Sequence, residues 1–232
     1  MKTVGILGGF GPETTAQFQL KIVDLFREKK LAVRPSMIIF NTPIFLQIEN
    51  DLINNSGKVN NFIPFLINGI HILEKSGADF LVLPCNTLHV LLPILKVKVD
   101  MPFMDLIQET TDSLKEKKVD KIAIIATEQT IKSNMHQNRL KLKEITPVVP
   151  TKIDQEKINR IISDLLDNKN QKKLKEDLRA IIKKFHSQGI KNILLACTDL
   201  QLIFPNIEGV IVYDTLDILA KSTVKFMLDE RR

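Results

Sequence analysis

At 232 residues with 44% hydrophobic content, the chain is long enough to bury one large core or two smaller ones. No apolar run approaches the roughly 20 residues of a membrane span, and no cleavable signal precedes the first strand-like run, so we expect a cytoplasmic protein without a membrane partner. The net charge is +6, but with no Trp and one Tyr the chain lacks the aromatic residues that interleave with basic patches in nucleic-acid-binding proteins, and we expect no nucleic-acid partner.

The first elements are predicted to be a strand, a tight turn and a helix. An apolar run over residues 2–9 ends in glycines, and a helical pattern extends from Pro12 to about Lys30. The glycines do not match the dinucleotide fingerprint, because its third glycine is absent, and a Walker loop would need Gly-Lys-Ser/Thr. Two interpretations of this loop stay open: a site for a small anion at a helix N-terminus, or a tight turn that requires glycine.

The pattern then alternates between strands and helices, which indicates parallel β-sheets in an α/β fold. Further strands are expected at residues 35–40, 80–84, 120–126, 145–149, 193–196 and 209–213. Helices are expected at residues 60–76, 88–95, 157–166, 174–188 and 216–229, with a loop and short helix over 44–56 and an extended run over 101–104.

One pattern occurs twice along the chain. An apolar run ends at Cys85 and another at Cys197, and each cysteine lies eight positions after a glycine that closes a helical pattern, Gly77 or Gly189. These are the only two cysteines in the sequence. We interpret the repeat as an internal duplication that gives two similar parallel-sheet α/β domains related by a pseudo-twofold axis. The first domain is expected to comprise residues 1–98 and 208–232, and the second residues 99–207.

Both cysteines are predicted to lie where ligands bind in such folds, beyond the carboxyl ends of parallel strands. Cys85 and Cys197 would then form opposite walls of one cleft, each at the start of a helix that favours the thiolate. A thiolate on one face of a carbon atom can remove a proton while a thiol on the other face supplies one, which inverts the stereocentre. A zinc site is less favoured, since Cys85 and His89 form a single i, i+4 pair, and a redox Cys-x-x-Cys pair is absent. His89 is expected near the rim of the cleft.

The motifs together resemble those of the aspartate/glutamate racemase family, the amino acid racemases that work without pyridoxal phosphate. The matching segments are Gly8-Gly9-Phe10-Gly11-Pro12-Glu13-Thr14, Pro84-Cys85-Asn86-Thr87-Leu88-His89, Ile124 to Thr130, Ala196-Cys197-Thr198-Asp199 and Asp214-Thr215. The resemblance covers essentially the whole chain, and it implies two domains with the site between them, a homodimer and no cofactor.

The resemblance also implies the roles of the site residues. Cys85 and Cys197 would be the catalytic pair. The substrate's α-carboxylate and amino groups would be held by four polar residues, Asn86, Thr87, Thr127 and Thr198. Three further residues would line the pocket, namely Phe10, Gln47 and Asp199.

The implied function is a racemase that interconverts L- and D-aspartate, with glutamate a less favoured substrate. Ile48 and Asp164 stand where some aspartate racemases carry basic groups, so the side-chain carboxylate is expected to meet backbone amides near Phe10 or a lysine such as Lys132. Two alternatives stay open. One is a related isomerase with paired cysteines, of the maleate isomerase or hydantoin racemase type, and the other is a non-catalytic amino-acid-binding protein.

Overall fold

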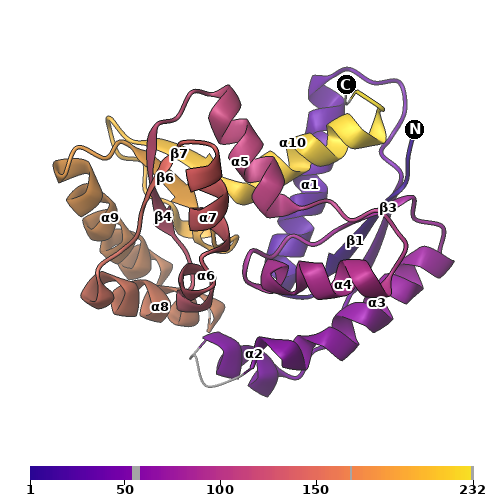
Figure 1. Cartoon of the computed structure of the whole chain (residues 1–232), viewed down its shortest axis with the longest axis horizontal. Helices are drawn as coiled ribbons and strands as arrows, with labels where there is room; N and C mark the ends of the chain where they lie inside the picture. The colour runs from indigo at the N-terminus through magenta and orange to yellow at the C-terminus, as the bar shows by residue number, and fades with distance from the viewer. Residues whose placement is uncertain (54–57, 168, 231–232) are drawn as a thin grey trace.

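The computed structural model describes residues 1–53, 58–167 and 169–230, which form two lobes side by side, each built on a parallel sheet (Figure 1). The strands in these ranges are β1 (Val4–Gly8), β2 (Met37–Asn41), β3 (Phe80–Val82), β4 (Lys121–Ile125), β5 (Thr146–Val148), β6 (Asn192–Leu195) and β7 (Ile211–Asp214). The strand order is β2-β1-β3 in the first sheet and β5-β4-β6-β7 in the second. The α/β class with two parallel sheets, predicted from the sequence, is confirmed.

Helices cover both sheets and connect their strands. They are α1 (Pro12–Glu28), α2 (Leu46–Ile53), α3 (Ile63–Lys75), α4 (Leu92–Lys98), α5 (Leu106–Glu116), α6 (Glu128–Lys132), α7 (Met135–Leu142), α8 (Lys152–Leu166), α9 (Gln171–Ser187) and α10 (Thr215–Met227). Short 3-10 turns lie at η1 (Val59–Phe62), η2 (Thr87–Leu91) and η3 (Leu200–Ile203). None of the helices in the described ranges is long and apolar enough to cross a membrane.

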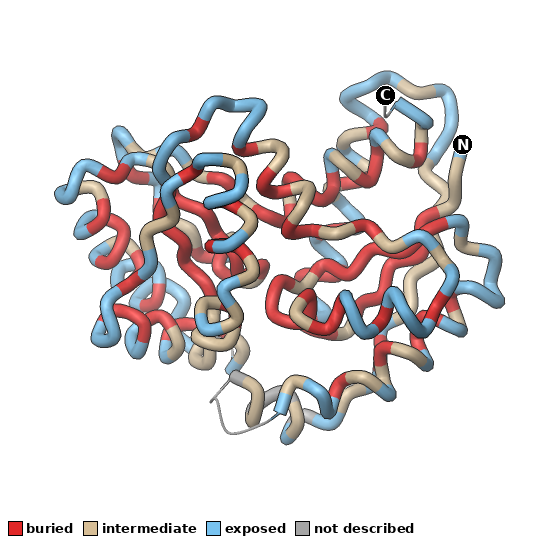
Figure 2. The backbone as a smooth tube through the Cα atoms, viewed as in Figure 1, coloured by how far each residue is buried: buried red, intermediate tan, exposed pale blue. Residues whose placement is uncertain are grey.

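The first sheet is buried on both faces because successive side chains of a strand point in opposite directions. In β1, Val4 and Ile6 pack with Phe18 of α1 and with α10, whereas Leu7 packs on the other face against Leu66 and its neighbours on α3. All five residues of β1 are buried, as the red core of Figure 2 shows for this lobe.

The second sheet follows the same rule. Ala123 and Ile125 of β4 face α8 and α9, while Ile122 and Ile124 face α5 and α7. Each central strand therefore has a continuous apolar sequence, and the polar residues that follow it lie at the open edge of the sheet.

Two segments do not lie in the domains predicted for them. Residues 208–232 were assigned to the first domain, but β7 pairs with β6 in the second sheet, with Ile211 beside Asn192. Only α10, which follows β7, packs against α1 on the first sheet. Phe103 was assigned to the second domain, yet it forms an isolated parallel β-bridge with Leu81 of β3 in the first lobe. The backbone of residues 102–104 makes hydrogen bonds to Leu81 there.

Candidate active site

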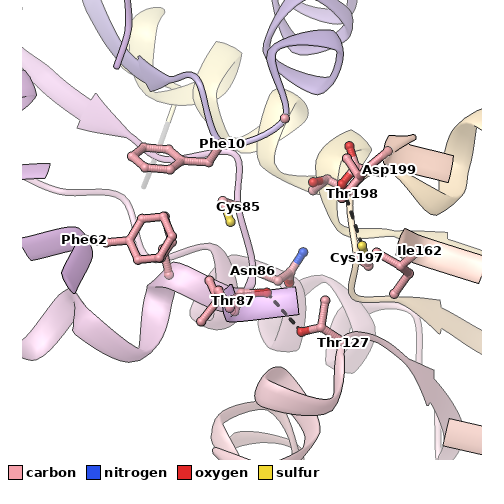
Figure 3. Close-up of a pocket in the computed structure, with 14 residues that line it drawn as sticks. Phe10, Phe62, Cys85, Asn86, Thr87, Thr127, Ile162, Cys197, Thr198 and Asp199 are labelled. Atoms are coloured by element: carbon pink, nitrogen blue, oxygen red, sulfur yellow. Dashed lines mark hydrogen bonds between the residues drawn. The ribbon is translucent and has the colours of Figure 1, made fainter. Parts of the chain in front are cut away.

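A pocket of about 540 Å³, part of it open to solvent, lies between the two lobes (Figure 3). Its walls come from the segments that follow four strands: Phe10 and Gly11 after β1, residues 85–88 after β3, Thr127 after β4, and residues 197–199 after β6. The pocket thus forms where the carboxyl ends of both parallel sheets meet, as expected for ligand sites in α/β folds.

Both cysteines line this pocket, one from each lobe. Cys85 is half-buried, whereas the Cys197 side chain is buried. Burial raises the pKa of the Cys197 thiol well above its ordinary value, and the nearby Asp199 carboxylate raises it further. The expectation that helix starts favour the thiolate is therefore wrong for Cys197, which is a neutral thiol at neutral pH.

Asp199 lies beside the thiol of Cys197 and is held by Thr14, in the first turn of α1 in the other lobe. The Cys197 Sγ lies 3.9 Å from Asp199 Oδ2, and Thr14 Oγ1 donates to Asp199 Oδ1 at 2.5 Å. Gly11 has a φ of +86°, and a Cβ at this position would lie 3.0 Å from Asp199 Oδ1. The loop of residues 8–11 therefore provides both a tight turn and a close approach to Asp199. Burial raises the pKa of the Asp199 carboxyl group.

Three threonine hydroxyls form a cluster, and two of these threonines, Thr87 and Thr127, line the pocket. Thr87 Oγ1 lies 3.0 Å from Thr127 Oγ1 and 3.2 Å from Thr130 Oγ1, and Thr127 Oγ1 donates to Thr130 Oγ1 at 2.9 Å. Thr127 also accepts the backbone N–H of Thr130 as the N-cap of α6. On another wall, the buried Thr198 donates to the carbonyl of Pro84 at 3.5 Å, which joins the two cysteine loops.

The side chain of Asn86 is fixed by a buried chain of hydrogen bonds. Its amide nitrogen donates to Thr215 Oγ1 at 2.8 Å, and Thr215 donates in turn to the carbonyl of Leu195 at 2.9 Å. His136 Nε2 lies 2.9 Å from the amide oxygen of Asn86, so this nitrogen carries the hydrogen. Burial lowers the pKa of His136 to about 3, which keeps the ring neutral. The chain orients Asn86 and connects both lobes next to Cys85.

The amino-acid sequence matches the profile of a family described as Asp/Glu/Hydantoin racemase over residues 7–223. The chain belongs to this family. It is 29% identical over 230 residues to the broad specificity amino-acid racemase RacX of Bacillus subtilis (strain 168), a match that covers 97% of this chain and 98% of that protein.

Solved structures share the fold of this chain. An aspartate racemase homologue from Pyrococcus horikoshii OT3 is 28% identical, with a TM-score of 0.77 over 98% of this chain and 100% of the other. Picrophilus torridus aspartate racemase shares the fold with a TM-score of 0.81 at 24% identity, over 98% of this chain and 94% of the other. Membership of the family places the chain among the amino acid racemases.

Most of the residues predicted for the racemase site line the pocket. They are Phe10, Cys85, Asn86, Thr87, Thr127, Cys197, Thr198 and Asp199. Gln47 is the exception: it is exposed on α2, its amide donates to Asp51 at 2.8 Å, and the pocket is lined from α2 by Leu52 instead.

His89 is buried rather than at the rim of the racemase cleft. Its Nδ1 donates to the carbonyl of Cys85 at 2.7 Å, and its Nε2 accepts the backbone N–H of Leu106 at 3.1 Å. Both ring nitrogens are thus occupied by the backbone, which argues against the alternative of a zinc ligand. Burial lowers the pKa of His89, so the neutral ring ties the Cys85 loop to the start of α5.

Sequence reasoning missed the apolar part of the racemase pocket. The residues concerned are Leu52, Phe62, Leu88, Ile162 and Leu166. Each belongs to a helical segment whose apolar residues look like ordinary core, so no local signal distinguishes them. His136 was missed for the same reason, since a single histidine in a helical pattern carries no signal of its partner.

Proposed function

We propose that this racemase inverts the α-carbon of an amino acid by proton transfer between Cys85 and Cys197, without a cofactor. The observation that carries the proposal is that both cysteines of the sequence line one pocket from opposite lobes, as Figure 3 shows. Matched acid/base groups on two sides of a substrate are what inversion in both directions requires.

In the proposed resting state, Cys197 is the thiol and Cys85 the thiolate. The raised pKa of Cys197 supports this assignment. Cys85 removes the α-proton of one enantiomer and becomes a thiol, and Cys197 gives its proton to the opposite face and becomes a thiolate. The other enantiomer reacts by the reverse transfer from the form in which Cys197 is the thiolate and Cys85 the thiol, and exchange of a proton with solvent interconverts the two forms of the free enzyme.

The polar residues of the pocket suit the groups that all amino acids share. The α-ammonium group has a carboxylate partner in Asp199, next to Cys197. The α-carboxylate can accept hydrogen bonds from the hydroxyls of Thr87, Thr127 and Thr198, with those of Thr127 and Thr198 rotating from Thr130 and Pro84 toward the substrate. Because Asn86 and Thr87 follow Cys85 directly, the same loop that carries the base also positions the substrate.

The alternatives raised by the sequence are less well supported. A non-catalytic binding protein would not need a second thiol beside a carboxylate in the same pocket. A maleate isomerase or a hydantoin racemase could also use two cysteines, and only the reaction itself separates these activities. Aspartate as substrate, the homodimer and the cytoplasmic location stay predictions.

The decisive test is to incubate the protein with single L-amino acids in deuterium oxide. Chiral chromatography should show the D-enantiomer, and NMR should show deuterium at the α-carbon. Turnover of maleate or a hydantoin, with no exchange in any free amino acid, would replace the proposal with the corresponding isomerase.

Two variants test the roles of the cysteines. Cys85→Ser and Cys197→Ser should each reduce racemisation by at least about 100-fold, because serine is a much weaker acid than cysteine and a general acid or base contributes about 10²–10⁴ in rate. Circular dichroism should confirm that both variants fold. Near-normal rates in both directions for either variant would contradict the two-cysteine mechanism.

A further inference from the structure

We infer that this pocket takes amino acids with uncharged, apolar side chains and discriminates against the acidic side chain expected from the sequence. The inference rests on the proposed racemase function and concerns the part of the pocket that the α-ammonium and α-carboxylate groups leave free. The polar and reactive side chains of the lining are Asp199, the threonines, the two cysteines and Asn86, whose amide is already bound to Thr215 and His136. The other described side chains that line the pocket are apolar.

The apolar residues come from both lobes. Phe10 and Phe62 pack together with ring centroids 6.0 Å apart beside Cys85, with Leu52 and Leu88 of the same lobe near them. Ile162 of α8 lies on the opposite side, next to Cys197 (Figure 3). A substrate side chain that binds between these walls leaves water for an apolar environment. This transfer favours binding of an apolar group and disfavours binding of an unpaired charge.

The described lining of the pocket offers no cation to a second carboxylate. None of the described residues that line the pocket is Lys or Arg, and its one charged residue is Asp199. Residues 35–57, the stretch with α2 and the undescribed residues 54–57, contain no Lys or Arg in their sequence. Lys132, the candidate named from the sequence, binds Glu128 at 2.6 Å and does not line the pocket.

Among the described residues, three acidic side chains near the pocket other than Asp199 already have partners. Asp164, on the same helix as Ile162, is bound to Lys169 at 2.6 Å, and Glu128 is bound to Lys132. Asp51 accepts the amide of Gln47. A lysine or ornithine substrate would have to compete with these contacts across an apolar wall, so the geometry favours neutral side chains such as those of methionine and leucine.

The test compares initial rates of α-deuterium exchange for L-Met, L-Leu, L-Asn, L-Asp and L-Lys. Asn and Asp have nearly the same shape, so their ratio measures the effect of charge alone. We expect Met and Leu to react fastest and Asp to react at least about tenfold more slowly than Asn, as for a charge without a partner. Asp reacting as fast as Asn, or Lys reacting as fast as Met, would overturn the inference.

Failure of this inference is distinguishable from failure of the proposed function. If none of the five amino acids exchanges, the chain is not a racemase of free amino acids and both proposals fall. If Asp or Lys exchanges fastest, racemisation stands and only the apolar specificity is wrong.

A pair of variants locates the side-chain end of the pocket. Leu166 is half-buried at the end of α8, where a lysine could bring its ammonium group to the pocket while its stem covers the apolar wall. Leu166→Lys should raise the rate with Asp relative to Met several-fold. Leu166→Met, a matched control of similar volume without charge, should keep the wild-type order of substrates. The same Asp-to-Met ratio in both variants would overturn the placement of the substrate side chain against α8.

Discussion

At the scale of single residues, the site depends on burial as much as on residue type. Cys85 and Cys197 follow corresponding strands, but Cys197 is the more buried of the two, and the Asp199 carboxylate lies beside its thiol. Its pKa is raised first by loss of water and then by the charge of Asp199. Burial and a neighbouring charge therefore disfavour the thiolate form of Cys197.

Asp199→Asn should lower the pKa of Cys197, because the substitution removes a negative charge that disfavours the thiolate. Thr14 can still donate to the amide oxygen of an asparagine, so the loop contact is kept. The measurement is thiolate absorbance against pH in a Cys85→Ser background, where Cys197 is the only thiol. An unchanged titration midpoint would mean that burial alone sets the pKa of Cys197.

Thr127→Val should raise KM more than it lowers kcat, since a hydroxyl that binds the α-carboxylate holds substrate and transition state about equally. Loss of a hydrogen bond to a charged group costs about 1.5–3 kcal/mol, which corresponds to roughly a 10- to 150-fold rise in KM. Thr127→Ser is the matched control, because it keeps the hydroxyl that caps α6. A collapse of kcat at unchanged KM would instead assign Thr127 to proton transfer.

At the scale of elements, the start of α10 holds a carboxylate whose charged form is disfavoured by burial. Asp214 is the N-cap and accepts the backbone N–H of Leu216 at 2.9 Å, and burial raises its pKa to about 6. Lys21 lies 3.7 Å away and offsets part of the effect. The folded pKa lies above the ordinary value of about 4, so the folded state holds this proton more tightly than the unfolded state does.

The charged form of Asp214 therefore destabilises the fold, fully above about pH 6 and hardly at all below about pH 4. Asp214→Asn keeps a good N-cap and removes the charge, so it should raise the free energy of unfolding at pH 7.5 by about 1–3 kcal/mol. Urea unfolding at pH 7.5 and at pH 4 checks this, and most of the gain should vanish at pH 4. A loss of stability at pH 7.5 would show that the attraction to Lys21 outweighs burial.

At the scale of the whole molecule, the lobes are joined by more than the covalent chain. α10 leaves the second sheet and packs on the first, and Asn86 and Thr215 are hydrogen-bonded across the boundary. We expect one cooperative unfolding transition, because neither lobe can lose its structure without exposing buried surface of the other.

Two probes can test this prediction lobe by lobe. Tyr213 on β7 is the only Tyr in a sequence without Trp, so its fluorescence reports on the second sheet. In a Cys197→Ser variant, thiol reactivity reports on Cys85 after β3 in the first lobe. Both signals should share one urea midpoint, and two separate midpoints would contradict cooperative unfolding of the lobes.

The sequence by itself determined the strands, their parallel arrangement and the pair of cysteines, because continuous apolar runs followed by polar residues mark buried strands and their carboxyl ends. It did not predict α5, since Thr110 and Thr111 occupy the buried face of that helix and conceal its apolar stripe. Tertiary structure alone decided that β7 joins the second sheet, that Gln47 does not line the pocket, and that His136 orients Asn86 from 50 positions away. These outcomes depend on which surfaces meet after folding, and local propensity and spacing carry no information about partners so distant in sequence.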